Sequence, residues 1–212
     1  MLDLSYALPK ESIEALVPGA STVVIATTVK DWRANKPGEV PSTSLFVWDE
    51  MVDRKRVKEP FKIAPYANDH DHKGGIYNFV QKELGAAPVT AAYSASMFRP
   101  GETDSFADVS LVRCYPKDIH ICDVEFSDYS KPLESTDPTA GFRGWRGLHI
   151  FPEFIARLTE VAKSQGVERI SLMVAHPPLL KTFQKYGFEV SLTEMAQQAF
   201  AIGQGFPMIL KV

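Results

Sequence analysis

The strongest constraint on the fold is an amphipathic helix predicted between two strands. Residues 152–165 begin with a proline and are followed by Gly166, a pattern typical of the start and the stop of a helix. Its apolar residues recur at helical spacing: Phe154, Ile155, Leu158, Val161 and Ala162. Strand-like segments at 119–126 and 169–175 flank this helix. A strand, helix, strand unit makes its two strands parallel, so the sheet is expected to contain a parallel pair.

The other strands predicted in the second half are joined by turns or follow short helices. Strands at 89–98 and 106–115 lead into 119–126 through turns at Pro100-Gly101 and at Pro116-Lys117-Asp118. A short helix at 177–186, strands at 188–192 and 206–212, and a short helix at 194–200 are expected near the end of the chain, and 127–142 is interpreted as a surface loop. The predicted fold class is therefore α/β (α+β), with a mixed, largely antiparallel central sheet flanked by helices.

The first 88 residues carry weaker signals. We expect a helix at 9–16, a buried strand at 21–28, a loop at 31–43 and a helix at 76–84. The segment Ser44–Met51, SLFVWDEM, is rich in β-branched and aromatic residues and is interpreted as a strand.

Composition excludes several classes of protein. The 212 residues include 23 basic and 26 acidic side chains, and 45% are hydrophobic. These values are ordinary for a globular chain, and the net charge of −3 lacks the basic surplus of a nucleic-acid-binding surface. No apolar run approaches the roughly 18 residues that span a bilayer, and no basic segment precedes an apolar one at the N-terminus. We therefore expect neither a membrane segment nor a signal peptide.

The two cysteines indicate a reducing compartment. The predicted hairpin turn places Cys114 opposite His120 and only diagonal to Cys122, which is poor geometry for a disulfide. Reduced cysteines and a cytoplasmic location are therefore expected.

The segment from Arg146 to Phe188 resembles the GNAT superfamily of acyl-CoA-dependent N-acyltransferases. In that family an Arg-Gly opens a glycine-rich loop before a helix, and here Arg146-Gly147 precede the helix that ends at Gly166. The next strand leads to a short helix that ends in Gly-Phe, matched by Gly187-Phe188. The resemblance implies one GNAT-like domain over 1–212, with a divergent part at 1–88 and a recognisable acyl-CoA-binding core at 89–212.

The resemblance also implies which residues meet the acyl-CoA. The loop and the first turn of the helix would offer backbone N–H groups to the pyrophosphate, while the pantetheine arm would lie where the following strand diverges from its neighbour. The residues expected to contact the acyl-CoA are Arg146, Gly147, Leu148, His149, Ile150, Phe151, Val174 and Phe183.

The sequence departs from the family pattern in this loop and after it. His149 and Phe151 stand where the family has glycines, and Phe183 stands where it often has a proton-donating tyrosine. Two alternatives remain open. In the first, the backbone amides still bind coenzyme A, whereas in the second the protein has lost this chemistry and acts as a binding or regulatory protein.

Three residues are candidates for catalysis. Glu125, near the end of a strand that usually supplies a general base in the family, could accept a proton from an ammonium, or it could be a hairpin carboxylate paired with Arg113 or with solvent. His176 could relay a proton or bind the pantetheine amide, or it could be a helix-end residue without a chemical role. Tyr186 could protonate the leaving thiolate in place of Phe183, or it could serve only in packing.

No metal is expected. Asp69-His70-Asp71-His72 lacks a spaced partner motif and is interpreted as a solvated loop. A Gly-x-Ser-x-Gly elbow, a Walker loop and a Rossmann fingerprint are all absent from the sequence. The expected function is direct transfer of an acetyl or other acyl group from acyl-CoA to a primary amine on a small molecule or a protein. Neither nucleic acid nor a membrane is an expected partner, and a homodimer is left open.

Overall fold

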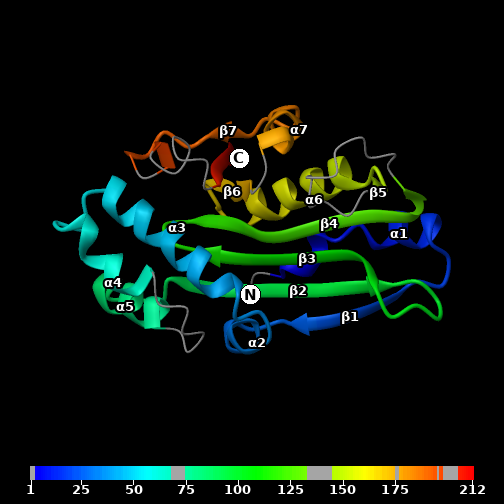
Figure 1. The fold of residues 1–212 in the computed structure, drawn as a ribbon, viewed down its shortest axis with the longest axis horizontal. Helices are drawn as coiled ribbons and strands as arrows, with labels where there is room; N and C mark the ends of the chain where they lie inside the picture. Colours follow the sequence, from blue (N-terminus) through cyan, green and yellow to red (C-terminus); the bar gives the residue numbers. More distant parts are fainter. Residues whose placement is uncertain (1–2, 68–74, 133–144, 175–176, 195, 198–204) are drawn as a thin grey trace.

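The computed structural model describes residues 3–67, 75–132, 145–174, 177–194, 196–197 and 205–212. Its strands form a single sheet in the order β1-β2-β3-β4-β6-β8-β7, with β5 paired to β4 outside this path (Figure 1). The strands are β1 (Ser21–Ala26), β2 (Val89–Phe98), β3 (Ser105–Cys114), β4 (Asp118–Pro132), β5 (Trp145–Gly147), β6 (Arg169–Val174), β7 (Glu189–Val190) and β8 (Phe206–Lys211). The helices are η1 (Leu4–Ala7), α1 (Lys10–Leu16), α2 (Val29–Asn35), α3 (Glu39–Asp53), η2 (Pro60–Ile63), α4 (Ala64–Ala67), α5 (Gly75–Leu84), α6 (Phe151–Ser164), η3 (Pro177–Leu179) and α7 (Leu180–Gln184).

The sheet is mixed, as predicted. Strands β1 to β4 pair antiparallel with their neighbours in sequence, β8 pairs antiparallel with both β6 and β7, and β4 and β6 are parallel. Helix α6 supplies the crossover between β4 and β6, as the strand, helix, strand pattern requires. The predicted fold class is therefore confirmed.

Each face of the sheet is covered by its own helices and carries its own apolar core. On one face η1, α1 and α6 pack against residues such as Leu111, Ile119 and Ile170. On the other face α2, α3 and α5 surround a second cluster that contains Trp32 and Trp48, both fully buried. In Figure 1, α3 crosses the near face of the sheet.

Helix α6 forms as its sequence indicates. Four apolar side chains of one stripe are buried: Phe154, Ile155, Leu158 and Ala162. The helix ends where Gly166 adopts φ +61°, the Gly166 N–H bonds to the Lys163 carbonyl, and the Val167 N–H bonds to the Ala162 carbonyl. This left-handed glycine stop satisfies carbonyls that the last turn would otherwise leave unpaired.

The prediction for residues 31–51 is wrong. The expected loop contains α2 and the start of α3, and the expected strand at 44–51 is the middle of α3. Pro41 lies in the first turn of α3, where a missing N–H costs no helical hydrogen bond. The buried residues of α3 recur every three or four positions: Val40, Thr43, Ser44, Phe46, Val47, Trp48, Glu50 and Met51. Tertiary burial of this face overrides the β propensity of the aromatic and β-branched residues.

Three smaller expectations are also corrected. β1 is an edge strand whose Val23 and Val24 are exposed, whereas a buried strand was expected. β4 continues to Pro132, so the start of the expected loop at 127–142 is strand. Cys114 faces Asp118, not His120, and both cysteines are free thiols.

The helices of the described segments include none with the length and apolar character of a bilayer-spanning helix.

Candidate functional site

The candidate site begins where β4 and β6 part. The two strands pair over four rungs, from Asp118 with Arg169 to Ile121 with Leu172. Beyond this last rung β4 is no longer bonded to β6 and instead meets β5, with Ser127 opposite Gly147. Main-chain groups on the facing edges of two diverging strands lack ladder partners and can bind an extended ligand between them. This parting matches the divergence that the resemblance implies.

A buried ion network fastens the start of the parallel pair. The Arg169 guanidinium donates to both carboxylate oxygens of Asp118, at 3.1 and 2.7 Å, and lies 2.5 Å from Glu50 on α3. Burial raises the pKa of Asp118 to about 6, although Arg169 acts in the opposite direction. The network therefore holds α3, β4 and β6 together at the first rung of the β4–β6 pair, where the two strands are still hydrogen-bonded.

The buried His120 lies in the same hydrogen-bonded part of the β4–β6 pair, opposite Ser171. Its ring stacks on Phe46 with centroids 4.7 Å apart, and Nδ1 lies 3.0 Å from Ser171 Oγ on β6. Burial lowers the pKa of His120 to about 4, so the ring is neutral near pH 7. With 3% of its surface exposed, His120 serves in packing.

The loop before α6 has a backbone shape that is normally made by glycine. Leu148 is anchored by a hydrogen bond from its N–H to the Phe126 carbonyl, at 3.1 Å. The next residue, His149, adopts φ +60°, and its side chain is exposed. Left-handed backbone at a residue with a side chain costs roughly 1–2 kcal/mol and is characteristic of functional loops. His149 therefore keeps the conformation of the glycine that the family has at this position.

The remaining residues expected to meet acyl-CoA lie at the parting or in the core beside it. Gly147 and Arg146 lie in β5, and the Arg146 side chain is outside the described atoms. Ile150 precedes the first helical residue of α6 and is 5% exposed. Val174 ends β6 and is buried in the α6-side core.

Aromatic side chains fill the space between the first turn of α6 and helix α7. The Phe151 ring centroid lies 5.5 Å from that of Phe183 and 5.1 Å from that of Tyr186, both in edge-on geometry. All three side chains are half-buried. Packing is thus the observed role of Tyr186, and Phe151 fills volume that a glycine would leave open.

Acidic side chains of β4 and β3 lie together on the face of the sheet that α3 covers. Glu125 is half-buried, and its carboxylate accepts a hydrogen bond from Ser127 Oγ at 2.6 Å. Its neighbour across the strands is Asp108 on β3, not Arg113, which lies opposite Ile119. The expected alternative pairing of Glu125 with Arg113 is therefore wrong, because Cys122 is an extra residue in β4 that shifts the register.

The structure adds Asp123, which sequence reasoning did not select. Within the described part of the chain, its carboxylate accepts no hydrogen bond and forms no ion pair. The pKa of Asp123, an exposed residue, is raised to about 6, mainly by desolvation of its carboxylate and also by the negative charges of Glu39, Asp108 and Glu125, while Lys36 acts in the opposite direction. A carboxyl that titrates near neutral pH is suited to general base catalysis. The sequence signal was the Asp-x-Glu spacing, which places both carboxylates on one face of the strand, and the bulge at Cys122 turns that face toward α3.

Two expected features fall outside the described residues. They are His176 and the Asp69-His70-Asp71-His72 segment. Within the residues that are described, no group of three or more histidine, cysteine, aspartate or glutamate side chains could hold a metal ion.

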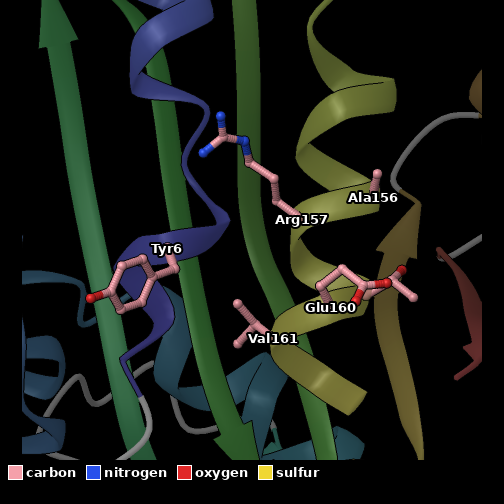
Figure 2. A pocket seen from close by; sticks show the side chains of 6 residues that line it. Tyr6, Ala156, Arg157, Glu160 and Val161 are labelled. Carbon is pink, nitrogen blue, oxygen red and sulfur yellow. The ribbon is translucent and has the colours of Figure 1, made fainter. Parts of the chain in front are cut away.

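A shallow hollow of about 540 Å³ lies on the far side of α6, away from the parting of β4 and β6. Figure 2 shows Tyr6 of η1 beside Arg157, Glu160 and Val161 of α6, which line it. Tyr6 is 70% exposed there. The hollow adds no group to the candidate site.

No protein-family model matches the chain, and no curated protein is a significant match in sequence. Among solved structures, the chain is similar to a protein from Bacillus anthracis str. Ames described as a streptothricin acetyltransferase, in complex with acetyl coenzyme A. The identity is 12%, the match covers 57% of this chain and 63% of that one, and the TM-score is 0.35.

Two further structures cover more of their own length. An acetyltransferase of the GNAT family from Staphylococcus aureus Mu50 is 11% identical, covers 91% of this chain and 99% of that one, and has a TM-score of 0.41. A Bacillus subtilis acetyltransferase in complex with CoA is 15% identical, with 64% and 83% covered and a TM-score of 0.33. The chain spans less than two thirds of the B. anthracis protein. Likenesses this distant decide nothing about activity, and the GNAT-like character of the fold rests on its own topology and parted strands.

Proposed function

We propose that this protein transfers an acetyl or other acyl group from acyl-CoA directly to a primary amine on a small molecule or a protein. The observation that carries the proposal is the parting of β4 and β6 beside a loop whose His149 has glycine-type backbone. The parted edges supply main-chain groups for an extended thioester arm. The start of the 14-residue helix α6 supplies amide groups and a favourable dipole for phosphate.

The residues around the parting fit such a donor in part. Backbone between Gly147 and Phe151 would hold the pyrophosphate, and Arg146 of β5 would supply a positive charge for it. Val174 would line the path of the acyl arm. The packed rings of Phe151 and Phe183 narrow the space beside α7. A bound donor would therefore have to displace one of these rings or pack in place of part of their contact.

The chemistry would use carboxylates on the α3 side of β4. An ammonium acceptor gives one proton to Asp123 or Glu125, and the neutral amine nitrogen then forms a C–N bond to the thioester carbonyl carbon while the C–S bond breaks. The nitrogen gives its second proton to water, and the leaving thiolate takes up one proton from Tyr186, from His176 or from water. Holding both reactants in place supplies most of the acceleration, because positioning replaces a bimolecular encounter.

A titration with acetyl-CoA tests the donor site. Bound ligand must raise the Tm of the protein, by the equivalent of about 2.7 kcal/mol at a hundredfold excess over Kd. The matched variants are His149→Gly and His149→Pro. Both remove the imidazole, but only proline forbids φ +60°. We expect His149→Gly to retain the ligand-induced shift and His149→Pro to lose it while remaining folded by circular dichroism. No shift in the unmodified protein at millimolar acetyl-CoA would overturn the proposal.

A second candidate function is supported by the aromatic contact of Phe151 with Phe183 and Tyr186. If that contact stays closed, the protein would act as a binding or regulatory protein without coenzyme A chemistry. Release of CoA thiol in the presence of any amine of a broad panel would exclude this candidate. An absence of both thiol release and acetyl-CoA binding would favour it.

A further inference from the structure

Strand β1 forms one edge of the sheet. Among the described strands it pairs with β2 alone, and it is the lowest strand of the sheet in Figure 1. In an antiparallel sheet, about half of the main-chain N–H and C=O groups of an edge strand point away from its neighbour. Ile25 is a bulge residue without a partner in β2, and its carbonyl accepts a hydrogen bond from Asn35 Nδ2 at 3.1 Å. The regular part of β1 that can accept a second strand therefore precedes Ile25.

This part of β1 carries accessible apolar side chains on both faces of the sheet. Val23 is 52% exposed and Val24 is 49% exposed. Because consecutive residues of a strand point to opposite faces, each face of the sheet ends in one uncovered valine. A helix or a loop lying on one face would cover only one of the two. A strand added at the edge would extend both faces and cover both valines.

The edge also lacks the usual protection against strand addition. Residues 19–29 contain no charged side chain and no proline. Edge strands are normally protected by charges, prolines, bulges or a short length. The opposite edge of the sheet follows this rule, because β7 has only two residues and one of them is Glu189. In β1 the bulge at Ile25 protects only the end of the strand, so residues 21–24 remain open to pairing.

Charges on either side of β1 identify a second copy of this chain as the partner. A two-fold axis pairs a strand antiparallel with its own copy, so the start of one β1 lies beside the end of the other. Glu14 lies at the start, since its carboxylate accepts a hydrogen bond from the Gly19 N–H at 2.9 Å. Exposed Lys30 follows the end of β1. Antiparallel self-pairing brings these opposite charges toward each other, and the copy presents the same uncharged strand with a valine on each face.

We propose that two copies of this protein form a dimer by antiparallel pairing of their β1 strands, which joins the two sheets into one. Val23 lies opposite the partner's Val23, and Val24 lies opposite the partner's Thr22. A register centred on Thr22 would leave Val24 outside the ladder of residues 21–23. A register centred on Val24 would use Ile25, whose carbonyl is already bonded to Asn35. Because β7 is protected, the assembly closes at two copies.

Sedimentation equilibrium of the full chain without ligand tests the dimer. We expect the mass to rise with concentration from that of one chain to that of two and then to stay constant. Val23→Lys places two ammonium groups opposite each other at the axis and should weaken dimerisation about tenfold or more. Leu192→Lys is the matched control, because Leu192 is 88% exposed and follows β7 at the other edge, and it should leave dimerisation unchanged. Far-UV circular dichroism should be the same for both variants and the unmodified protein.

Single cysteines test the register independently of Val23→Lys. In the proposed pairing the two copies of residue 23 lie directly opposite, with Cα atoms about 4.5–5.5 Å apart, which is within reach of a disulfide. The two copies of residue 22 are diagonal neighbours about 7–8 Å apart, at or beyond the limit for a disulfide. Val23→Cys should therefore form a covalent dimer under mild oxidation, and Thr22→Cys should form at least about tenfold less. The unmodified protein, with Cys114 and Cys122, is the blank.

The outcomes decide the dimer separately from the proposed function, because β2 and β3 separate β1 from β4. A single-chain mass for the unmodified protein at all concentrations up to about 1 mM would overturn the dimer even where acetyl-CoA binds. Equal weakening by Val23→Lys and Leu192→Lys would overturn the assignment to β1, and a covalent dimer of Thr22→Cys but not of Val23→Cys would overturn the register. A dimer that Val23→Lys alone weakens supports the proposal even where no CoA thiol is released.

Discussion

At the scale of single residues, His149 and Asp123 share a property: neither is optimal for the stability of the fold. His149 has a left-handed backbone conformation that glycine adopts without cost, and Asp123 is a carboxylate held among other carboxylates. Residues that lower the stability of the fold, and have no structural role that explains their presence, concentrate at functional sites. Asp123 lies in β4 just after its last rung with β6, and His149 lies in the loop between β5 and α6.

His149→Gly should stabilise the protein. Relief of the left-handed strain outweighs the added entropy of glycine in the unfolded chain, so the free energy of unfolding should rise by up to about 1 kcal/mol. Urea denaturation measures it. The control is Gly166→Ala, which imposes a side chain at φ +61° with open space around the new Cβ. That variant should lose about 1 kcal/mol, and a loss for His149→Gly as well would contradict the strain argument.

Deprotonation of Asp123 should have opposite effects on stability and on activity. Its pKa is about 6 in the folded protein and 3.8 as the ordinary value, so the native state binds more protons between these pH values. The contribution of Asp123 to stability is therefore present below pH 4 and is lost as the pH rises through 6. As a general base it works only when deprotonated, so kcat/KM should rise over the same range.

Asp123→Asn should remove both effects. The variant should have a higher Tm than the unmodified protein at pH 7, and the two proteins should converge near pH 4. Its residual kcat/KM should no longer show a titration near pH 6. A rate profile that keeps the titration in Asp123→Asn but loses it in Glu125→Gln would instead assign the base to Glu125.

At the scale of elements, strand pairing was predictable and register was not. Turn residues and alternating apolar residues define β2, β3 and β4 from the sequence, and the crossover helix defines the parallel pair. The bulge at Cys122 leaves no such signal, yet it turns Asp123 and Glu125 toward α3 rather than toward Arg113. The placement of Asp123 and Glu125 beneath α3 could therefore not be predicted, although both residues are visible in the sequence.

Helix α3 shows a second limit of the same kind. Phe46, Val47 and Trp48 favour a strand by propensity, and only burial against the sheet selects the helix. Since Glu39 lies in its first turn, mistaking α3 for a strand also hides one carboxylate of the site. By contrast, the position of His149 before α6 was predicted, because a helix start follows from Pro152 and the apolar stripe.

The ion network of Arg169 joins three elements, and its loss should be costly. Arg169→Met leaves Asp118, which is 0% exposed, without its ion-pair partner, and leaves Glu50, which is 2% exposed, with Arg54 at 3.4 Å. Unfolding should become easier by about 3–5 kcal/mol at pH 7. Because protonation of Asp118, whose pKa is raised to about 6, removes its unpaired charge, the deficit should shrink as the pH is lowered toward 5. Arg157→Met, which breaks contacts at the surface of α6, is the control and should change stability little. An equal effect of the two variants would show that the network is dispensable.

At the scale of the whole molecule, the two helical layers are tied to one sheet at separate points. α3 is bonded to β3 through Glu39 and Ser110, to β4 and β6 through the Arg169 network, and to the segment after β7 through Asp49 and Thr193 at 2.6 Å. These contacts span the sheet from its centre to its far edge. The layer that carries Glu39 is thus part of the cooperative fold.

This arrangement predicts a single unfolding transition. Trp32 and Trp48 are fully buried in the α3-side core, so their fluorescence in a Trp145→Phe background reports that layer alone. Far-UV circular dichroism reports both layers. Coincident urea transitions are expected, because the tethers couple the layers in one two-state unit. A fluorescence transition at lower urea than the dichroism would mean that α2 and α3 detach first.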